Sequence, residues 1–536
     1  MTRNKHTSSH WRPVAVATAS ALALSVLAGC SQNSSSSSSG SAVALTTVSI
    51  VSPLTYDTAP AADSEIQKNI ESILGVKLNI TWVPNASYND KMTTLLAGND
   101  LPDLLVVQGK TPAFVQSAQA GAFWDLTDYI KDYPNLAPNT AAEQRTGVPL
   151  DTQMIYTNSS INGQVFGIPR IRDVMRVATI VRKDWLEKLN LPVPQTVDDL
   201  YNVANAFTNN DPDGNGVKDT YGLIIPKWPG NYASQSPYDV IETWFGAPND
   251  WGVVNGKLVP GFDTPAFLTA NQFVKKMVNE GLINPDYATL DSGTWDQPFL
   301  QGKGGIIIDM SSRASQLMGE FKKQDPSTYA NYVTMDGNLI GPSGTRLSYP
   351  TTGYNGFIAI PKSKVPDEAT LRAVLSVLDK MNSEQAQIAI NNGVEGRNFT
   401  VQDGFAVGVN SDDPAIKTMS ADAMSMGQIG MQISGYKAYA SMPAGDAEKA
   451  LYQLRLQIHA RDAEGTVVTD PGLALVSQTA TDLGVTLNTI IPDARIKYYA
   501  GQLDDQGLKN EIQRWYSSGG QQVVDEMNDL YQKMNK

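Results

Sequence analysis

Thiol and imidazole side chains are nearly absent from this chain of 536 residues, which holds one cysteine and three histidines. The single cysteine, Cys30, excludes any disulfide within the chain, and His459 is the only histidine beyond residue 10. Neither a Gly-x-Ser-x-Gly turn nor a His-Glu-x-x-His motif occurs, so serine, cysteine and zinc hydrolysis lack their usual groups. We therefore expect a protein that is not an enzyme.

Clusters of basic residues are also missing beyond the N-terminal segment. The 41 Lys and Arg residues are outnumbered by 54 Asp and Glu residues, which gives a formal net charge of −13. Because a phosphate backbone is held by clustered Lys and Arg, this composition argues against nucleic acid as a partner. Later apolar runs, such as Ile306 to Ile308, have the length of a strand and not of a membrane span.

The N-terminus has the composition of an export signal. Three basic residues, Arg3, Lys5 and Arg12, precede an apolar run of 16 residues, Pro13 to Ala28. This run is shorter than the roughly 20 residues that cross a bilayer, which disfavours the alternative of an uncleaved signal anchor. The segment Leu27 to Cys30 resembles the lipobox of bacterial lipoproteins, in which the cysteine is acylated and becomes the first mature residue.

This lipobox resemblance implies a protein tethered by lipid to the extracellular face of the cell membrane. Residues 1–29 are expected to form the signal peptide. Residues 30–45 contain the lipidated Cys30 and a serine run, Ser34 to Ser39. Because this run cannot bury apolar surface, we expect it to form a flexible linker between the lipid and the folded body.

Apolar periodicity predicts an α/β fold that begins near Thr46. The expected elements are strands at 48–51, 78–82 and 104–107, and helices at 66–74, 88–96, 366–381 and 523–534. Asp63 is placed to cap the first of these helices. Alternating strands and helices favour a mostly parallel sheet with helices on both faces, and the length of the chain suggests two such lobes.

A series of local signatures runs along the chain in a fixed order. The signatures are Ala97 to Asp103, Gly121 to Asp128, Asn162 to Pro169, Val181 to Leu186, Gly246 to Leu258, Gly281 to Asp286 and Gly393 to Phe399. Together they resemble family 1 of the extracellular solute-binding proteins, and most of all the large Gram-positive lipoproteins that deliver oligosaccharides to ABC importers. The resemblance covers nearly all of the mature chain.

The resemblance implies a two-lobed fold of the periplasmic-binding-protein type II, with hinge crossings between the lobes. Lobe one is expected to combine 46–170 with 348–400, and lobe two is expected to combine 171–347 with 401–536. Closure on a ligand would bend the crossings near 168–175 and 349–357.

The resemblance also implies a function. The protein is expected to capture an oligosaccharide or a related carbohydrate in the cleft between the lobes, as a monomer, and to pass it to ABC permease subunits. Two other classes stay open, which are a tethered glycan sensor or adhesin and a glycoside hydrolase that uses two carboxylates.

One loop has the residue spacing of a calcium site, with oxygen-bearing side chains at alternate positions and glycine at the sixth. Gly222 stands where an EF-hand has its glutamate, and Thr220 stands where the family has an acidic residue. We expect a structural Ca²⁺ ion, with the ligands Asp211, Asp213, Asn215, Val217, Asp219 and Thr220. The alternative is an ordinary Asx-rich turn that holds no metal.

Candidate ligand contacts are aromatic residues in broken segments and polar residues near the crossings, since flat rings stack on sugars and planar polar groups bind hydroxyls. The aromatic candidates are Trp228, Trp244, Trp251 and Trp295. The polar candidates are Arg170, Arg172, Asp173, Asp309, Tyr354 and Asn355, to which the resemblance adds Glu395 and Arg397. Each of them has an ordinary alternative role in a core, a turn or a surface salt bridge.

Overall fold

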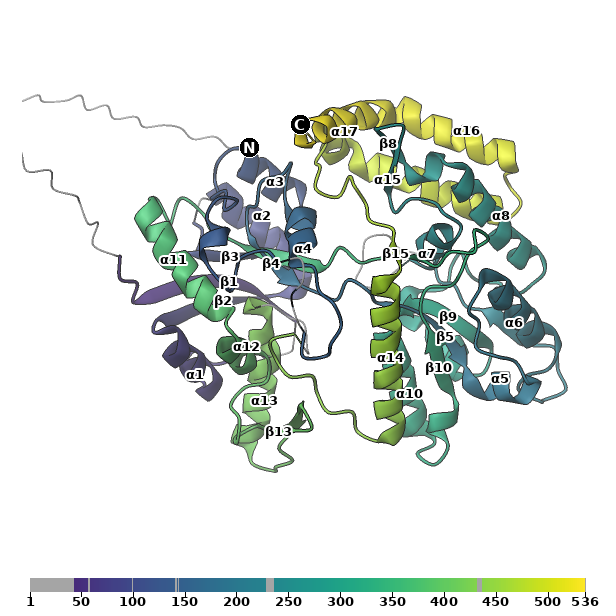
Figure 1. Ribbon diagram of the computed structural model, residues 1–536, viewed down its shortest axis with the longest axis horizontal. Coiled ribbons are helices and arrows are strands. Elements are labelled where there is room, and N and C mark those ends of the chain that lie inside the picture. Colours follow the sequence, from purple (N-terminus) through teal and green to yellow (C-terminus); the bar gives the residue numbers. More distant parts are fainter. Residues whose placement is uncertain are drawn as a thin grey trace, which may run out of the picture. The chain divides into compact units, whose positions relative to one another are not determined.

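The computed structural model describes residues 43–55, 58–98, 100–139, 142, 144–227, 236–430 and 436–535. The predicted signal peptide, Cys30 and the serine run lie outside the described residues, and so does Trp228. The folded body begins at Val43 and contains two main β-sheets, each of which forms the centre of one lobe (Figure 1). None of the described helices is both long and apolar enough to cross a membrane.

Lobe one is built on a five-stranded sheet with the order β2-β1-β3-β12-β4. Its strands are β1 (Thr47–Leu54), β2 (Lys77–Pro84), β3 (Leu104–Val107), β4 (Ile168–Ile171) and β12 (Tyr354–Ala359). Strand β1 is parallel to β2 and β3, whereas β12 is antiparallel to β3 and β4. The predicted parallel arrangement is thus confirmed for the first three strands.

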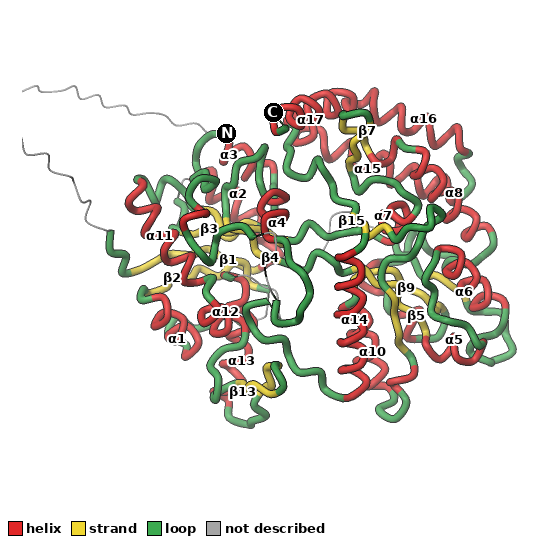
Figure 2. Tube along the Cα trace, in the orientation of Figure 1, coloured by secondary structure: helices red, strands yellow, loops and turns green. Residues whose placement is uncertain are grey.

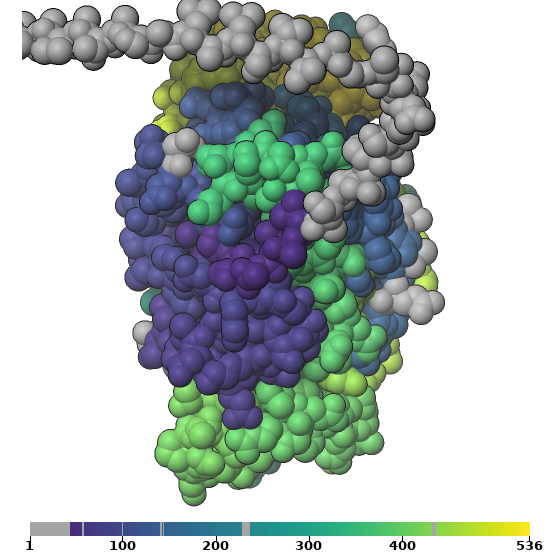
Figure 3. Space-filling model, turned by 90° about the vertical axis from the view of Figure 1, so that its left-hand side faces the viewer, coloured from purple at the N-terminus to yellow at the C-terminus, as the bar shows by residue number. Residues whose placement is uncertain are grey.

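Both faces of this sheet are covered by helices, as the wholly apolar sequence of β3 requires. Leu104 and Val106 belong to one buried cluster, whereas Leu105 and Val107 belong to another, because successive side chains of a strand point to opposite faces. The helices of this lobe are α1 (Glu65–Leu74), α2 (Tyr88–Gly98), α3 (Pro112–Gln119), α4 (Thr152–Ser159), α11 (Glu368–Met381), α12 (Glu384–Asn391) and α13 (Pro414–Met426). N-terminal α1 contacts α12 and α13, so segments far apart in the sequence meet on the face of lobe one (Figure 3).

Local sequence sets the ends of α1. The Ser64 hydroxyl accepts a hydrogen bond from the backbone N–H of Gln67 at 3.2 Å, so the cap is Ser64 and not the predicted Asp63. The helix ends at Gly75, whose φ of 78° is a left-handed conformation that favours glycine.

Lobe two is built on a four-stranded sheet with the order β10-β5-β9-β6. Its strands are β5 (Val177–Arg182), β6 (Tyr221–Leu223), β9 (Gly304–Met310) and β10 (Val333–Asp336). Strand β5 is antiparallel to β9 and β10, and the β6–β9 pair is parallel. The expectation of mostly parallel sheets therefore does not extend to this lobe.

Helices cover the second sheet in the same way, since Ile306 and Ile308 of β9 enter one buried cluster and Ile307 enters another. The helices are α5 (Lys183–Leu189), α6 (Val197–Asn209), α7 (Pro237–Trp244), α8 (Pro265–Asn279), α9 (Gln297–Leu300), α10 (Ser312–Gln324), α14 (Asp446–Glu464), α15 (Gln478–Tyr499), α16 (Asp505–Trp515) and α17 (Gln521–Met534). Three short two-stranded ladders complete the strands (Figure 2). They are β7 (Trp251–Val254) with β8 (Lys257–Pro260), β11 (Leu347–Ser348) with β15 (Thr466–Val467), and β13 (Phe399–Gln402) with β14 (Phe405–Gly408).

Helix α13 corrects the predicted lobe boundary. Met419, Ala423 and Met426 of this helix are buried in the core of lobe one, where α13 contacts α1 and α12. The prediction that all of 401–536 belongs to lobe two is therefore wrong for this helix. Apolar spacing predicts that a helix has a buried face, but it does not show which of two cores receives that face.

Candidate ligand site at the crossing segments

Two crossing segments, residues 172–176 and 349–353, run side by side between the sheets. The backbone N–H of Arg172 donates to the carbonyl of Gly353 at 2.7 Å, and the N–H of Thr351 donates to the carbonyl of Val174 at 2.8 Å. The Thr351 hydroxyl adds a hydrogen bond of 2.7 Å to the carbonyl of Asp173. The two segments are thereby held as one unit.

Arg170, at the end of β4, supports this unit from below the surface. Only 2% of the residue is exposed, and its guanidinium donates to the carbonyl of Asn355 at 3.0 Å and to the side chain of Gln428 at 2.7 Å. Its buried Nε has no hydrogen-bond partner among the described residues. Because the side chain is enclosed and held by protein groups, Arg170 positions the crossing and is poorly placed to touch a ligand.

The charged residues of the first crossing are partly desolvated, although part of each side chain is still exposed to water. Asp173, Arg172 and Arg176 are half-buried. Desolvation raises the pKa of Asp173, opposed by the charges of Arg176, Arg455 and Arg172, and desolvation lowers the pKa of Arg176. A charged group that touches water and is nevertheless desolvated has protein on several sides, as on the wall of a concave surface.

Helix α14 brings two further groups to the same place. The backbone N–H of Ser311 donates to the carbonyl of Arg176 at 2.7 Å, and the Ser311 hydroxyl lies 2.9 Å from Nε2 of His459. Desolvation, and then the charges of Arg455 and Arg176, lower the pKa of His459 to about 3. Arg455 lies one helical turn before His459, so both belong to the face of α14 that meets the crossing.

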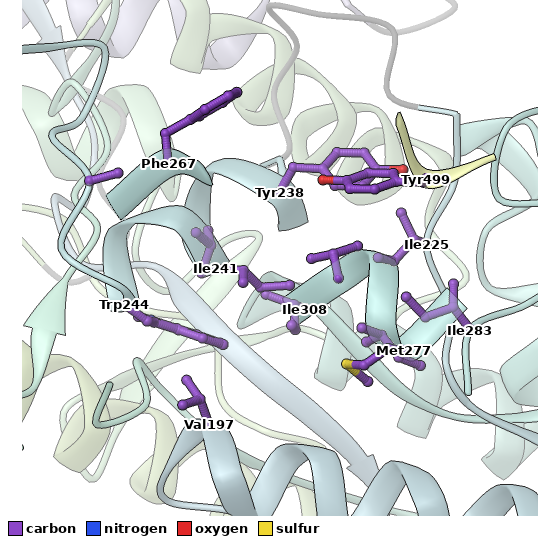
Figure 4. Close-up of a cluster of buried hydrophobic side chains, with 14 of the residues drawn as sticks. Val197, Ile225, Tyr238, Ile241, Trp244, Phe267, Met277, Ile283, Ile308 and Tyr499 are labelled. Carbon is purple, nitrogen blue, oxygen red and sulfur yellow. The ribbon is translucent and has the colours of Figure 1, made fainter. Parts of the chain in front are cut away.

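Two of the predicted aromatic contacts are core residues. Trp244 has no exposed surface, donates its Nε1–H to Asn338 at 3.1 Å, and lies near Val197 and Ile241 in the core of lobe two (Figure 4). Trp295 is equally enclosed and donates to the carbonyl of Ile224 at 3.0 Å. The prediction of ligand contacts at Trp244 and Trp295 is wrong, because a ligand cannot reach a fully buried ring.

Trp251, on β7, keeps part of its surface exposed. It packs on Gly472, where an added Cβ would lie 2.7 Å from Cδ1 of the ring. The carboxylate of Asp470 accepts the backbone N–H of Gly472 at 2.8 Å, while desolvation and the nearby Asp250 raise the pKa of Asp470 to about 8. Asp250 is exposed, yet desolvation raises its pKa to about 6. Trp251, Asp250 and Asp470 therefore form a second surface whose polar groups are partly desolvated.

Lobe one reaches this second surface through hydrogen bonds. The ammonium of Lys110, from the segment after β3, donates to the carbonyl of Leu473 at 2.7 Å. Asn162 donates its backbone N–H to the carbonyl of Ala474 at 2.8 Å and accepts the N–H of Val476 at 2.9 Å. The segment 470–476 thus contacts both lobes.

Asp309 is the third corrected contact. The carboxylate is 1% exposed and forms a salt bridge with Arg313, which also pairs with Asp296 and lies 4.7 Å from the centre of the Trp295 ring. This buried network occupies Asp309, so the prediction that Asp309 contacts the ligand is wrong.

The other polar candidates lie in two places, on β12 and on the loop before β13. Tyr354 is half-buried and Asn355 is exposed, and both follow the second crossing on β12. Arg397 forms a two-pronged salt bridge with Glu65, at 2.9 and 3.0 Å, which accounts for its position without a ligand. Glu395 is exposed on the same loop.

The predicted calcium loop closes on itself through hydrogen bonds. The carboxylate of Asp211 accepts the backbone N–H groups of Gly214 at 2.9 Å, Asn215 at 3.1 Å and Gly216 at 3.1 Å. Desolvation acts in the opposite direction, but these hydrogen bonds and the charge of Lys188 lower the pKa of Asp211. In this conformation the first carboxylate of the loop is therefore directed at the backbone.

The remaining loop residues test the proposed ligand set. The Asn215 amide donates to Asp213 at 2.6 Å and to Asp219 at 3.3 Å, and Asp219 also pairs with Lys303. The hydroxyl of Thr220 donates to the carbonyl of Phe207 at 2.8 Å inside the protein, so the prediction of Thr220 as a ligand is wrong.

The carbonyl of Val217 accepts the N–H of Asp219 at 3.1 Å and keeps one lone pair. In the described part of the chain, no three His, Cys, Asp or Glu side chains stand ready to hold a metal ion. Carboxylate and amide oxygens are nonetheless the ligand types of Ca²⁺. Those that fit by type are Asp211, Asp213, Asn215 and Asp219, and they would converge only after rotation.

A surface hollow elsewhere has no connection with the crossings. It has a volume of about 370 Å³ between α8 and α15 and is lined by Gln272, Lys275, Lys276, Asn279, Glu280, Tyr498 and Asp505. The Lys275 ammonium lies 3.9 Å from the centre of the Tyr498 ring, and Tyr498 donates to Asp505 at 2.6 Å. These groups satisfy one another, so the hollow is a weaker candidate.

Two helix-covered sheets joined by paired crossing segments define a two-lobed solute-binding fold. The chain belongs to the bacterial extracellular solute-binding proteins, whose family description matches residues 58–388. It is 41% identical to the lipoprotein LipO of Bacillus subtilis strain 168 over 486 residues, which cover 91% of this chain and 92% of LipO.

Two further relatives carry ligand names. The polygalacturonan/rhamnogalacturonan-binding protein YtcQ of Bacillus subtilis strain 168 is 30% identical over 481 residues, which cover 90% of each chain. The structure of the ABC-transporter substrate-binding protein FusA of Streptococcus pneumoniae with kestose shares the fold, with a TM-score of 0.61 and 18% identity over 91% of this chain and 99% of FusA. A second structure of FusA is described as an EF-hand mutant.

Sequence reasoning missed several residues of the two desolvated surfaces, which are Lys110, Arg176, Asp250, Arg455 and Asp470. Arg176 could have been predicted from the sequence, because it lies three residues after the predicted Asp173 on the same crossing. Arg455 carried no local signal, since only the packing of α14 brings it to the crossing.

Proposed function

We propose that this protein is the lipid-anchored, extracellular binding component of an ABC importer, and that it holds an oligosaccharide between its lobes without altering it. The observation that carries the proposal is the gathering of desolvated, water-reaching polar residues at the paired crossings. Hinge closure of two lobes encloses a ligand at such a position. The names of YtcQ and FusA support a carbohydrate and, for FusA, an ABC transporter.

The N-terminal sequence supports the tether. The lipobox-like segment that ends at Cys30 follows an export signal, and a serine run separates it from the folded body. Each buried methylene of an acyl chain adds about 0.8 kcal/mol, so two chains hold a protein at a membrane where one chain binds reversibly. Mass spectrometry of the membrane-extracted protein would find a diacylated Cys30, whereas an unmodified cysteine would contradict this part of the proposal.

Within the site, we propose direct contacts from Arg172, Asp173, Trp251, Tyr354 and Asn355, with Arg170 behind them. A thermal-shift screen of neutral and acidic oligosaccharides tests the function as a whole. A ligand that binds only the folded state raises its stability by about 2.7 kcal/mol at a hundredfold excess over Kd. A melting temperature that no saccharide raises would contradict carbohydrate binding.

We further propose that the loop 211–219 binds Ca²⁺ as a structural ion. Its oxygen groups support this, and so does the likeness to FusA, for which an EF-hand mutant has been made. Binding would require Asp213 and Asp219 to turn away from Asn215 and Lys303. We expect EDTA to lower the melting temperature and calcium, but not magnesium, to restore it, while Asp213→Asn should abolish the response. Indifference of the unmodified protein to EDTA would overturn the metal proposal.

A further inference from the structure

The crossing segments gather positive charge in a chain whose formal net charge is −13. Arg170 is the third residue of β4, Arg172 and Arg176 lie on the crossing that follows this strand, and Arg455 reaches them from α14. Arg455 also lies over the ring of Tyr452, with 4.7 Å between its guanidinium carbon and the ring centre. We call these four arginines the crossing cluster.

Few carboxylates of the described residues lie near Arg176 and Arg455, two members of the crossing cluster. The charge of Asp173 acts on Arg172, Arg176 and Arg455, whereas Asp309 acts on Arg176 but is itself bound to Arg313. Neither Arg176 nor Arg455 forms a salt bridge with a carboxylate in the described part of the chain. Among the described residues, positive charge therefore exceeds negative charge around Arg176 and Arg455.

The excess charge is held at an energetic cost. Desolvation, and next the charges of Arg170 and Arg176, lower the pKa of Arg172. A guanidinium stays protonated at neutral pH even so, because its ordinary pKa lies above 12. Partly buried like charges that lie close together destabilise a folded protein. An anion supplied by the ligand would remove this repulsion.

We propose that the crossing cluster binds the carboxylate of a uronic-acid residue, so that the ligand is an acidic oligosaccharide. This inference rests on the proposed function, to which it adds the chemical class of the sugar. The guanidinium is planar and donates two parallel hydrogen bonds, which match the two oxygens of a carboxylate. Arg176 and Arg455 are the donors, because they are half-buried and make no salt bridge with a described carboxylate.

The test uses the full chain, purified in mild detergent, and isothermal titration calorimetry. The probes are trimers of galacturonate, glucuronate and mannuronate, their methyl esters, the corresponding neutral trimers, and a sulfated neutral trimer. We expect at least one uronate trimer to bind, to lose tenfold or more in affinity on esterification, and to bind more weakly at higher salt because the recognised groups are charged.

Variants locate the binding to the crossing cluster. Arg176→Gln and Arg455→Gln should each weaken binding of the uronate about tenfold or more, since hydrogen bonds to charged groups are the strong ones. Their effect on any ester or neutral trimer should be small. Arg176→Lys keeps the positive charge but loses the planar guanidinium. Its affinity for the uronate should lie between that of the unmodified protein and that of Arg176→Gln. The control is Arg372→Gln on α11, an exposed arginine that pairs with Glu368 and should change nothing.

The outcomes separate this inference from the proposed function. Neutral, esterified or sulfated trimers that bind as tightly as the uronates would overturn the acidic ligand while the oligosaccharide function stands. Full uronate affinity in Arg176→Gln and Arg455→Gln, with urea midpoints that show folded protein, would also overturn it. If no trimer of any kind binds, the proposed function itself fails.

Discussion

At the scale of single residues, two tryptophans distinguish a ligand contact from a core residue. Trp244→Ala should lower the free energy of unfolding by about 3–5 kcal/mol, because it removes a fully buried ring. Trp251→Ala should leave most of that stability and weaken saccharide binding tenfold or more, since this ring is partly exposed beside Asp470. Urea unfolding and calorimetry measure the two effects, and undiminished affinity in Trp251→Ala would remove Trp251 from the site.

His459 makes stability depend on pH. Its pKa in the folded protein is lowered to about 3, whereas an unperturbed histidine has a pKa near 6.5. Between these values the unfolded chain binds a proton that the folded chain excludes. Stability should therefore fall by about 1.4 kcal/mol for each pH unit below about 6.5, and this contribution should be constant above that value.

The comparison is with His459→Gln, which can still accept a hydrogen bond from Ser311. Urea midpoints of both proteins at pH 4, 5 and 7 isolate the histidine, since other titrating groups are common to both. The variant should lose less stability on acidification. Identical pH dependence in the two proteins would contradict a neutral, buried His459.

At the scale of elements, the second crossing contains a glycine that no other residue can easily replace. Its backbone φ is positive, and there is no room for a Cβ atom. Gly353 has a φ of +79°, and an added Cβ would lie 2.6 Å from Cγ1 of Ile155 and 3.3 Å from Cγ2 of Val174. Gly344 has nearly the same φ, +77°, with no atom within 4 Å of an added Cβ. A comparison of substitutions at Gly353 and Gly344 therefore separates the cost of backbone strain from the cost of crowding.

Gly344→Ala should cost about 1 kcal/mol of unfolding free energy, from strain alone. Gly353→Ala should cost about 1–3 kcal/mol more, because overpacking is added to strain, and it should also weaken ligand binding by displacing the crossing. Equal costs at the two positions would show that Ile155 and Val174 give way freely, and the crossing would then be softer than its contacts suggest.

The elements also show how far sequence reasoning reaches. Periodicity located β1, α1, β2 and β3 because each has a local apolar pattern, and the ordered signatures indicated the family. The lobe of α13, the burial of Trp244 and the hydroxyl direction of Thr220 depend on contacts between distant segments. Arg455 could not be predicted as a site residue for the same reason, since only the packing of α14 brings it to the crossing. A pattern within one segment contains no information about such partners.

At the scale of the whole molecule, two sheets with their own cores are joined by crossings that are paired by hydrogen bonds. The ordinary carboxylate and guanidinium groups at these crossings are desolvated yet still reach water. Binding without catalysis needs no more than such a surface and a hinge. The fate of a bound saccharide tests whether the protein binds without catalysis.

The most direct measurement is the mass of what the protein retains. The purified full chain is incubated with a mixture of neutral and acidic oligosaccharides, separated from free sugar by gel filtration and then unfolded, and the released material is analysed by mass spectrometry. We predict one saccharide per chain, with the mass of a compound that was supplied. Retention of no saccharide, or release of shortened products, would contradict binding without catalysis.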